Sequence, residues 1–276
     1  MQAKAVYYWE TRMHTVKLAG KAALLSVGIV CMAVFAHCAE PGLGEKIRTV
    51  ADLNGKRLGA IVGTTLDSAA NGSLDFTQIH YYNDSDEQIE ALYLGEIDAF
   101  LDDEPVARFL AGRDSGLRVV EGVLMEDEYG YAMRLDDEGL YEKINPLLVK
   151  KIEDGTLRRL EKKWIDSSEG ETAEPAPELS AGRILRFGVS PVSAPFVYKV
   201  KGRIAGLDID LMRDIAESLG MRLEVVVMDF GELMGALQSG DVDVIGSCFS
   251  ITEERKRLVR FTDSYYQGGV AAVTLE

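Results

Sequence analysis

The stretch from Arg183 to Asp263 decides the fold of this chain. It reads, in order, RILRFGVSPVSAPFVY (183–198), GRIAGLDIDLMRDIAESLG (202–220), MRLEVVVMDFGELMGALQSGDVDVIG (221–246) and SCFSITEERKRLVRFTD (247–263). Three short apolar runs in it favour strand and hardly alternate with polar residues, namely Ile184–Val189, Leu223–Val227 and Val242–Ile245. Such runs are typical of strands that are buried on both faces of a sheet.

A helix is predicted between the first two of these strands. Apolar residues recur there at helical spacing: Leu211, Met212, Ile215, Ala216 and Leu219. Asp208 and Asp210 lie near its predicted start and Gly220 follows its end, as is common at helix boundaries. Strands and helices that alternate at this spacing predict right-handed crossovers in a mostly parallel sheet, and therefore an α/β fold.

Residues 41–128 are predicted to form a second α/β lobe. The stretch ADLNGKRLGAIVGTTLDSAANG (51–72) predicts a turn, a strand over Arg57–Val62 and a helix that begins at Thr64 or Thr65. A strand (79–84), a helix–turn–strand unit (86–103) and another strand (114–122) follow. ALYLGEIDAF (91–100) and ALQSGDVDVI (236–245) share a helix that ends at glycine and runs into a strand, which suggests two related lobes.

Several motifs now carry a resemblance to a known family. GLDIDLMRDIAESLG (206–220), VVVMDFGELMGALQSGDVDVI (225–245) and SITEERKRLVRFTDSYY (250–266) resemble the first lobe of the bacterial extracellular solute-binding proteins, family 3, the amino-acid-binding type. VADLNGKRLGAIVGTT (50–65), EALYLGEIDAFLDDEPVA (90–107), EYGYAMRLDDEGLYEKIN (128–145) and IEDGTLRRLEKKW (152–164) resemble its second half, in that order. The resemblance implies a two-lobed periplasmic-binding-protein type II fold with a hinge, in circularly permuted order.

The resemblance also implies a domain plan. Residues 41–128 would form lobe 2, residues 129–166 the return hinge strand and closing helices, and residues 184–276 lobe 1. Residues 167–183, SSEGETAEPAPELSAGR, are acidic and contain proline, so they are predicted to be a linker that joins the family's usual termini. Circular permutation is tolerated where termini are close together. The alternative is a truncated or wrongly assembled tandem gene, but the short spacing between the export segment and Glu45 favours permutation.

Residues 1–38 are predicted to be a signal peptide or an N-terminal membrane anchor. Residues 22–36 carry no charge and follow Lys17 and Lys21. This run is shorter than the about 20 residues of a membrane span and fits the core of a secretory signal. Lipidation of Cys38 and a start of translation at Met13 are left open. The expected location is the periplasm or the extracellular face of the cell membrane.

The composition excludes several kinds of function. The 276 residues are 47% hydrophobic and 27% charged, as in ordinary soluble globular proteins. A formal net charge of −15 argues against nucleic-acid binding. Three histidines and no CxxC argue against a metal site, and no glycine-rich phosphate-binding motif opens a helix. We therefore expect no metal, no cofactor and no catalytic residue, and a monomer.

A two-lobed α/β protein binds its ligand between the lobes, outside the carboxyl ends of the strands. An amino acid needs a cation for its carboxylate, hydroxyl or backbone donors beside it, and an anion for its ammonium. Arg255 lies early in a predicted helix and could clamp a carboxylate, although it could also be a solvated arginine. The resemblance identifies Arg255 as the family's carboxylate-binding arginine and Ser250 as the hydroxyl or backbone contact near it.

Other candidates come from the second lobe. Thr64 and Thr65 follow Gly63 at a strand-to-helix turn, which suits an anion, although plain helix capping is the alternative. The resemblance assigns them to the contact with the carboxylate and identifies Asp103 as the ammonium-binding aspartate. Asp102 is the alternative to Asp103, because strand alternation turns only one of them inward.

The remaining candidates are Phe230, which is either an apolar wall of the site or a core residue, and two departures from the family's pattern. Ser193 stands where the family often has an aromatic residue, and Cys248 where glycine or serine is usual. Ser190 stands where binders of basic side chains tend to have an acid. These departures disfavour a standard cationic amino acid and leave the ligand's identity open.

The sequence therefore predicts an exported protein that captures an amino acid or a similar small polar solute. Its expected partner is an ABC permease or a membrane sensor. The alternatives are a sensory or degenerate binding domain and, on the same scaffold, an enzyme like the cyclohexadienyl dehydratases. For the enzyme, Glu104 and Glu128 would be the candidate general acids, although neither lies in a recognisable catalytic motif.

Overall fold

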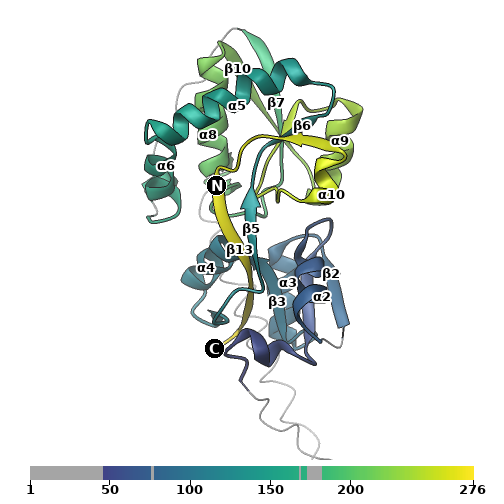
Figure 1. Cartoon of the computed structure of the whole chain (residues 1–276). Helices are drawn as coiled ribbons and strands as arrows, with labels where there is room; N and C mark the ends of the chain where they lie inside the picture. The colour runs from purple at the N-terminus through teal and green to yellow at the C-terminus, as the bar shows by residue number, and fades with distance from the viewer. Residues whose placement is uncertain (1–45, 76–77, 168, 173–181) are drawn as a thin grey trace, which may run out of the picture. The chain divides into compact units, whose positions relative to one another are not determined.

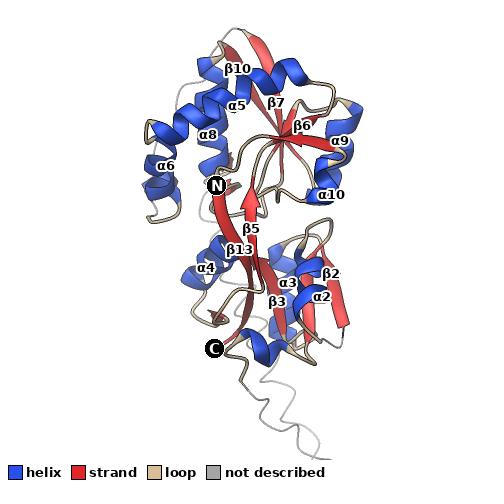
Figure 2. Cartoon of the chain, viewed as in Figure 1, coloured by secondary structure: helices blue, strands red, loops and turns tan. Residues whose placement is uncertain are grey.

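The computed structural model describes residues 46–75, 78–167, 169–172 and 182–276 (Figure 1). The expected signal or anchor segment, with Cys38, lies outside these residues, as does most of the expected linker. Among the described residues, no helix has the length and apolar character needed to cross a membrane. The described chain mixes α-helices and β-strands, as predicted (Figure 2).

The first part of the chain builds a six-stranded sheet. Its strands are β1 (Arg57–Ile61), β2 (Gln78–Tyr82), β3 (Ala99–Asp103), β4 (Leu117–Val119), β5 (Met125–Tyr129) and β13 (Tyr266–Leu275), in the order β2-β1-β3-β13-β4 with β5 paired to β13. β1 runs parallel to β2 and β3, whereas β13 is antiparallel to β3, β4 and β5. The connections contain the short 3-10 helix η1 (Val50–Leu53) and the helices α2 (Leu66–Ser73), α3 (Ser85–Leu94) and α4 (Glu104–Arg113).

The second part builds a five-stranded sheet. Its strands are β6 (Ala132–Arg134), β7 (Arg183–Val189), β10 (Met221–Val227), β11 (Val244–Ile245) and β12 (Val259–Phe261), in the order β10-β7-β11-β6-β12. β7 is parallel to β10 and to β11, which confirms the predicted parallel core. Its other elements are α5 (Glu138–Glu153), α6 (Thr156–Trp164), α7 (Glu169–Thr172), β8 (Tyr198–Val200), β9 (Arg203–Ala205), α8 (Leu207–Ser218), η2 (Phe230–Glu232), α9 (Leu233–Ser239) and α10 (Glu253–Lys256).

The two sheets have the same topology. Each has a parallel core in the order second–first–third, β2-β1-β3 in one and β10-β7-β11 in the other. In each, an antiparallel strand from a distant part of the chain follows the third strand, β13 beside β3 and β6 beside β11. The glycines of the two similar segments 91–100 and 236–245, Gly95 and Gly240, both end a helix in the left-handed conformation, with φ of 71° and 82°. The shared topology supports two related lobes.

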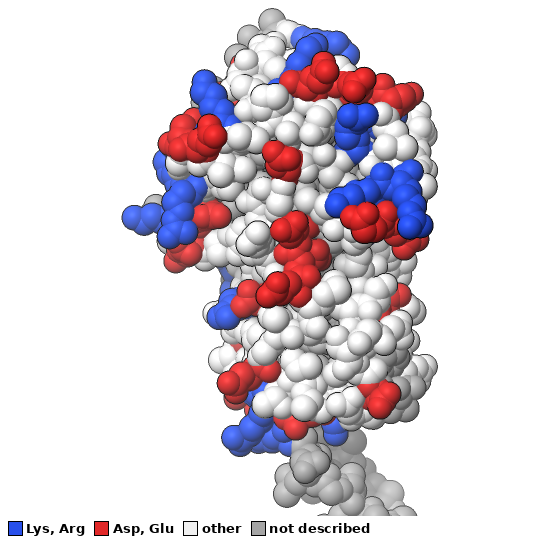
Figure 3. Space-filling model, viewed as in Figure 1, with Lys and Arg blue, Asp and Glu red and all other residues white. Residues whose placement is uncertain are grey.

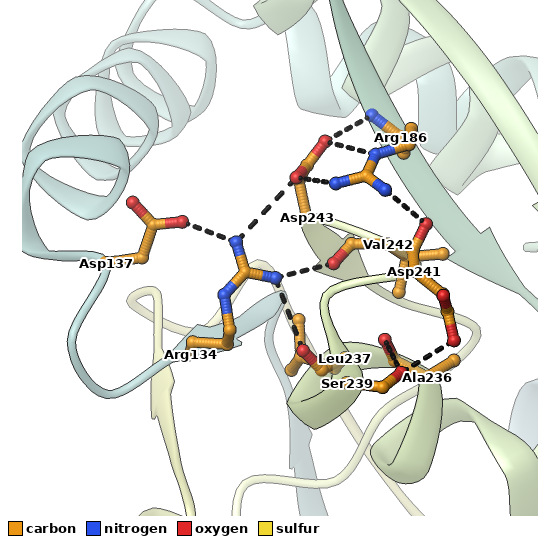
Figure 4. A network of polar contacts seen from close by, with 9 residues as sticks. All are labelled: Arg134, Asp137, Arg186, Ala236, Leu237, Ser239, Asp241, Val242 and Asp243. Carbon is orange, nitrogen blue, oxygen red and sulfur yellow. Dashed lines mark hydrogen bonds and ion pairs between the residues drawn. The ribbon is translucent and has the colours of Figure 1, made fainter.

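Each sheet also has the same arginine–aspartate clamp. Its aspartate lies in one of the two similar segments, 91–100 or 236–245. In the six-stranded sheet, Nε and Nη2 of Arg57 donate to Asp98 at 3.1 and 2.7 Å. In the five-stranded sheet, Arg186 makes the same two contacts with Asp243 at the same distances (Figure 4). Arg134 on β6 lies 3.7 Å from Asp243, so the clamp also ties the arriving strand to its neighbour.

The chain passes between the sheets twice, and aromatic rings line both passages. The first passage runs from β5 to β6 and the second from β12 to β13 (Figure 1). Tyr131 stacks on Tyr265 with ring centroids 4.6 Å apart, and Tyr129 stacks on Tyr266 at 5.8 Å. These pairs join the two passages, which is where a hinge would have to move.

The structure changes one expected boundary. We expected residues 184–276 to form a single lobe, but β13 pairs with β3, β4 and β5 in the six-stranded sheet. Residues 266–275 therefore belong with the sheet built by the first part of the chain. The cause is the backbone pairing of a long strand, because its buried residues Val270–Val273 complete that sheet's core.

The closing helices pack on the five-stranded sheet's side, where α6 contacts α8. Lys163 and Trp164 both donate to Asp210 on α8, at 2.6 and 2.9 Å. Part of the expected linker is also structured, because Glu169–Thr172 forms α7. The indole of Trp164 lies so close to Gly170 that any side chain there would clash with it. This packing explains why α7 departs from the coil expected over residues 167–183.

Candidate functional site

A small cavity lies at the carboxyl ends of the parallel strands of both sheets. Its lining residues are Ile61, Thr64, Thr65, Leu66, Asp102, Asp103, Val192, Ser193, Phe230, Cys248 and Ser250. Seven of the eight predicted site residues are among them, and Arg255 is the eighth. The cavity measures about 20 Å³, which is room for roughly one water molecule.

The fold explains why these residues meet. Loops that follow parallel strands gather at one edge of a sheet, and that edge is the usual place for a ligand. Residues 62–65 follow β1, Asp103 ends β3, residues 190–193 follow β7 and residues 246–250 follow β11. The cavity thus joins equivalent loops of two sheets with the same topology.

Arg255 links two of these loops. It lies on α10, where its backbone N–H donates to the hydroxyl of the N-cap residue Thr252 at 3.1 Å. Its guanidinium donates to the carbonyl of Ser250 at 3.1 Å and to the carbonyl of Gly63 at 3.0 Å. The guanidinium carbon lies 4.1 Å from the centre of the Phe249 ring. Burial lowers the pKa of Arg255 to about 10, so it stays charged at neutral pH.

The two threonines have different roles. The hydroxyl of Thr64 donates to the carbonyl of Ile61 at 2.7 Å, so it is used within its own turn. The hydroxyl oxygen of Thr65 lies 3.2 Å from that of Ser250. Thr65 is the N-cap residue of α2, yet its side chain makes no capping hydrogen bond. Its hydroxyl therefore faces Ser250 and does not cap the helix.

Asp103 is a cavity-lining acid whose pKa is strongly perturbed. Burial raises its pKa to about 7, the charge of Asp127 also raises it, and the hydroxyl of Tyr129 and the charge of Arg255 lower it. Asp102 is buried and accepts from the backbone N–H of Asp103 at 2.9 Å and from the Ser85 hydroxyl at 3.5 Å. The backbone and α3 thus engage Asp102, whereas Arg255 and Tyr129 act on Asp103.

Sequence reasoning missed Asp127, which comes from β5. One of its oxygens accepts from the backbone N–H of Glu128 at 2.8 Å, and the other is buried without a hydrogen-bond partner among the described residues. Burial raises the pKa of Asp127, while Ser250 and Arg255 act to lower it. Asp127 lies in a run of three consecutive acids, Glu126–Glu128, which is typical of an exposed segment. Strand alternation turns only the middle acid inward.

Sequence reasoning also treated Asp208 only as a charge at the start of a helix. The structure buries it completely, with one oxygen accepting from the backbone N–H of Ser247 at 2.9 Å. Burial raises the pKa of Asp208 to about 6. Ser247 and Cys248 have φ of 79° and 52°, a conformation that is uncommon for residues other than glycine. Asp208 therefore holds the backbone turn that carries Cys248 into the cavity wall.

The departures from the family's pattern lie around this turn. The backbone N–H of Ser190 donates to the hydroxyl of Ser247 at 2.9 Å. The hydroxyl of Ser193 donates to the carbonyl of Ser247 at 3.3 Å. Burial raises the pKa of the Cys248 thiol, which keeps it protonated. Ser190 and Ser193 thus join the loops after β7 and β11.

Phe230 shows both of the roles that were left open for it. It lines the cavity, and it is buried in the apolar cluster around α9 with Phe249, whose ring centre lies 5.8 Å away. No group of three or more His, Cys, Asp or Glu side chains within residues 46–75, 78–167, 169–172 and 182–276 is placed to hold a metal ion.

Comparison with known proteins gives matches to part of the chain. The profile of the bacterial extracellular solute-binding proteins, family 3, matches residues 185–276. The "Probable amino-acid-binding protein YxeM" of Bacillus subtilis is 36% identical over 90 residues, which is 33% of this chain and 34% of that protein. The "Arginine-binding extracellular protein ArtP" of the same organism is 40% identical over 87 residues, 32% of this chain and 34% of that protein.

Among solved structures, the arginine-bound form of domain 1 from TmArgBP is 38% identical, and the match covers 32% of this chain and 78% of that chain with a TM-score of 0.30. The chain spans about a third of the length of the curated relatives it matches.

Proposed function

We propose that this chain, whose residues 185–276 match the bacterial extracellular solute-binding proteins, family 3, is a member of that family and captures an amino acid or a similar small polar solute. The relatives are named as binding proteins for amino acids, arginine and histidine. Binding would take place at the cavity between the loops after β1 and β3 and those after β7 and β11.

One observation carries this proposal, namely that the carboxyl group of Asp103 lines the same cavity as the hydroxyls of Thr65 and Ser250. The guanidinium of Arg255 lies beside that cavity, on the carbonyls of Ser250 and Gly63. Arg255 would bind the ligand's carboxylate, and Ser250 and Thr65 would donate to it. Asp103 would accept from the ammonium. The charge of Arg255 acts on the pKa of Asp103, as expected of opposite charges that face one small space.

Binding requires the cavity to open. A cavity of about 20 Å³ admits a water molecule but no amino acid. The contacts that close it are the one between Arg255 and the Gly63 carbonyl and the one between the Thr65 and Ser250 hydroxyls. A ligand that supplies its own carboxylate to these groups would replace the contacts and favour the closed form around itself.

The wider setting is part of the same proposal. A circular permutant is part of the proposal, because residues 185–276, which match the family, follow the segments that resemble its second half. The protein would be exported, monomeric and held by its N-terminal segment if that segment is not cleaved, and would pass its solute to an ABC permease. A sensory or degenerate domain that signals to a membrane partner is the alternative.

An enzymatic role has less support. The carboxylate of Glu104 pairs with Arg108 at 2.6 Å, and that of Glu128 accepts from Gln267 at 3.3 Å. Neither glutamate lines the cavity at Ser250. A general acid must lie within hydrogen-bond reach of the reacting group, so neither is placed for the dehydratase chemistry considered above.

A thermal-shift screen of the full chain against amino acids, small peptides and dicarboxylates tests the proposal. A ligand at about 100 times its Kd stabilises the folded state by roughly 2.7 kcal/mol, which raises the melting temperature measurably. We expect an α-amino acid to give this shift. A single cooperative melt that no amino acid shifts would contradict capture and favour the degenerate domain.

A further inference from the structure

A second and larger cavity lies beside the passages between the sheets. It measures about 310 Å³, within the range of about 300–1,000 Å³ that is usual for small-molecule sites. Four separate segments line it: the start of α4, the residues after α6, Pro195, and Tyr266 at the start of β13. None of the eight predicted site residues is among them.

The walls of this second cavity are aromatic and held in place from behind. The ring of Tyr266 stacks on Tyr129 at 5.8 Å and meets the edge of Phe196 at 5.0 Å. The ring of Phe109 packs edge-on against Tyr198 at 5.1 Å. Rings that neighbours already fix lose little freedom when a ligand binds between them, so the cavity is pre-organised.

The charge around this cavity is negative. Glu104 and Asp166 line it, and Arg108 is the basic residue among the lining residues. Arg108 is already paired with Glu104 at 2.6 Å, and its side chain is 71% exposed. Within the described part of the chain, no ion pair engages Asp166.

The pKa of Tyr266 reflects the same negative charge around the second cavity. Burial, together with the negative charges of Glu104, Glu161 and Asp166, raises this pKa to about 12. On the face drawn in Figure 3, acidic side chains gather in the region that β5 and α4 occupy in Figure 1. A cation is therefore favoured at this cavity, and an anion is disfavoured.

We infer that this cavity is a second binding site and that it takes a small organic cation, a protonated amine on an aromatic or apolar body. The body would lie against Phe109 and Tyr266, and the ammonium would pair with Asp166. The faces of aromatic rings also attract cations. The inference does not depend on the proposed capture of an amino acid at the cavity near Ser250.

Calorimetric titration of the full chain at pH 7 with phenethylamine tests the inference. 3-Phenylpropionate is the matched anion, because it has the same ring and spacer with the opposite charge. We expect saturable one-to-one binding of the amine and no binding of the anion at the same concentrations. Asp166 is exposed, so Asp166→Asn should weaken amine binding by about two- to fivefold, because it removes the charge that pairs with the ammonium.

Three further variants locate the amine. Phe109→Leu should weaken binding because it removes a ring from the wall, and Asp136→Asn, an exposed acid elsewhere, should leave it unchanged. Asp103→Asn should also leave amine binding unchanged, although it should impair amino-acid binding at the other cavity. Absence of amine binding by a cooperatively melting chain would overturn the inference. Binding that is undiminished in both Asp166→Asn and Phe109→Leu, or that Asp103→Asn abolishes, would overturn it too.

Discussion

Arg255 shows how one side chain can hold the candidate site closed and also be available to a ligand. Its guanidinium donates to two backbone carbonyls, those of Ser250 and Gly63. These carbonyls lie in loops that follow strands of different sheets. A carbonyl is a weaker partner for a guanidinium than a carboxylate is. A ligand carboxylate can therefore displace these carbonyls.

Substitution of Arg255 by alanine should weaken amino-acid binding and leave the protein's stability nearly unchanged. The loss should be about 1.5–3 kcal/mol of binding free energy, or about 10- to 150-fold in Kd, because hydrogen bonds to a charged group are lost. Arg257→Ala, an exposed arginine just after the same helix, is the control. Calorimetric titration measures both. Unchanged affinity in Arg255→Ala would rule out the clamp.

We expect Asp103 to make amino-acid binding depend on pH. Its pKa of about 7 in the folded protein lies above the usual 3.8, because burial favours the neutral form. The stability that comes from this neutral form is present below about pH 4 and is lost as the pH rises through about 7. An ammonium ligand needs the ionised carboxylate, so ligand binding must release a proton at lower pH.

Amino-acid affinity should therefore fall by up to about tenfold per pH unit below pH 7. Titrations at pH 6 in two buffers of different ionisation enthalpy should show net proton release. In Asp103→Asn this release should disappear, whereas the exposed control Asp136→Asn should retain it. Proton release that persists in Asp103→Asn would assign the titrating group to Asp102 or Asp127.

At the scale of the element, the helix α8 supports the site through its first turn. Asp208 lies there, fully buried, and accepts from the backbone N–H of Ser247 in the loop after β11. Ser247 and Cys248 keep their left-handed conformation at a cost, which neighbouring hydrogen bonds must offset. The helix start and the loop turn are therefore one structural unit.

Asp208→Ala should destabilise the protein by about 1–3 kcal/mol, because the N–H of Ser247 would be left buried and unpaired. It should also weaken amino-acid binding, since Ser193, Cys248 and Ser250 all depend on this loop. Glu217→Ala, an exposed acid on the same helix, is the control. Chemical denaturation gives the stability. A wild-type midpoint in Asp208→Ala would show that Asp208 does not hold the turn.

For the whole molecule, the question is whether binding requires the loops of the two sheets to separate. The hydroxyl oxygens of Thr65 and Ser250 are 3.2 Å apart, so cysteines at both positions would bring two sulfurs together. The double variant Thr65→Cys with Ser250→Cys should form a disulfide that keeps the cavity closed.

When oxidised, the double variant should bind no amino acid, and reductant should restore its affinity to that of the same variant never oxidised. Thr65→Cys alone, treated with the same oxidant, is the control and should keep its affinity. Calorimetric titration before and after reduction measures the change. Full binding by the cross-linked protein would show that the ligand does not enter at this cavity.

Some residues of the candidate site could be predicted from the sequence, and others could not. A resemblance in motif identified Arg255, Ser250, Thr65 and Asp103, and the structure brings all four to one place. The resemblance in motif did not identify Asp127 or Asp208. Asp127 lies within an acidic run and Asp208 in an ordinary helix start, so neither pattern distinguishes a buried acid from an exposed one.

The sequence by itself determined the parallel strands of both sheets and the helices between them. These follow from periodicity, capping residues and glycines, which act between residues close together in the chain. Only the tertiary structure decided that β13 completes the six-stranded sheet, that Trp164 packs on Gly170 and that Asp127 and Asp208 are buried. These outcomes depend on contacts between distant segments, and local patterns carry no information on which distant group will exclude water from a side chain.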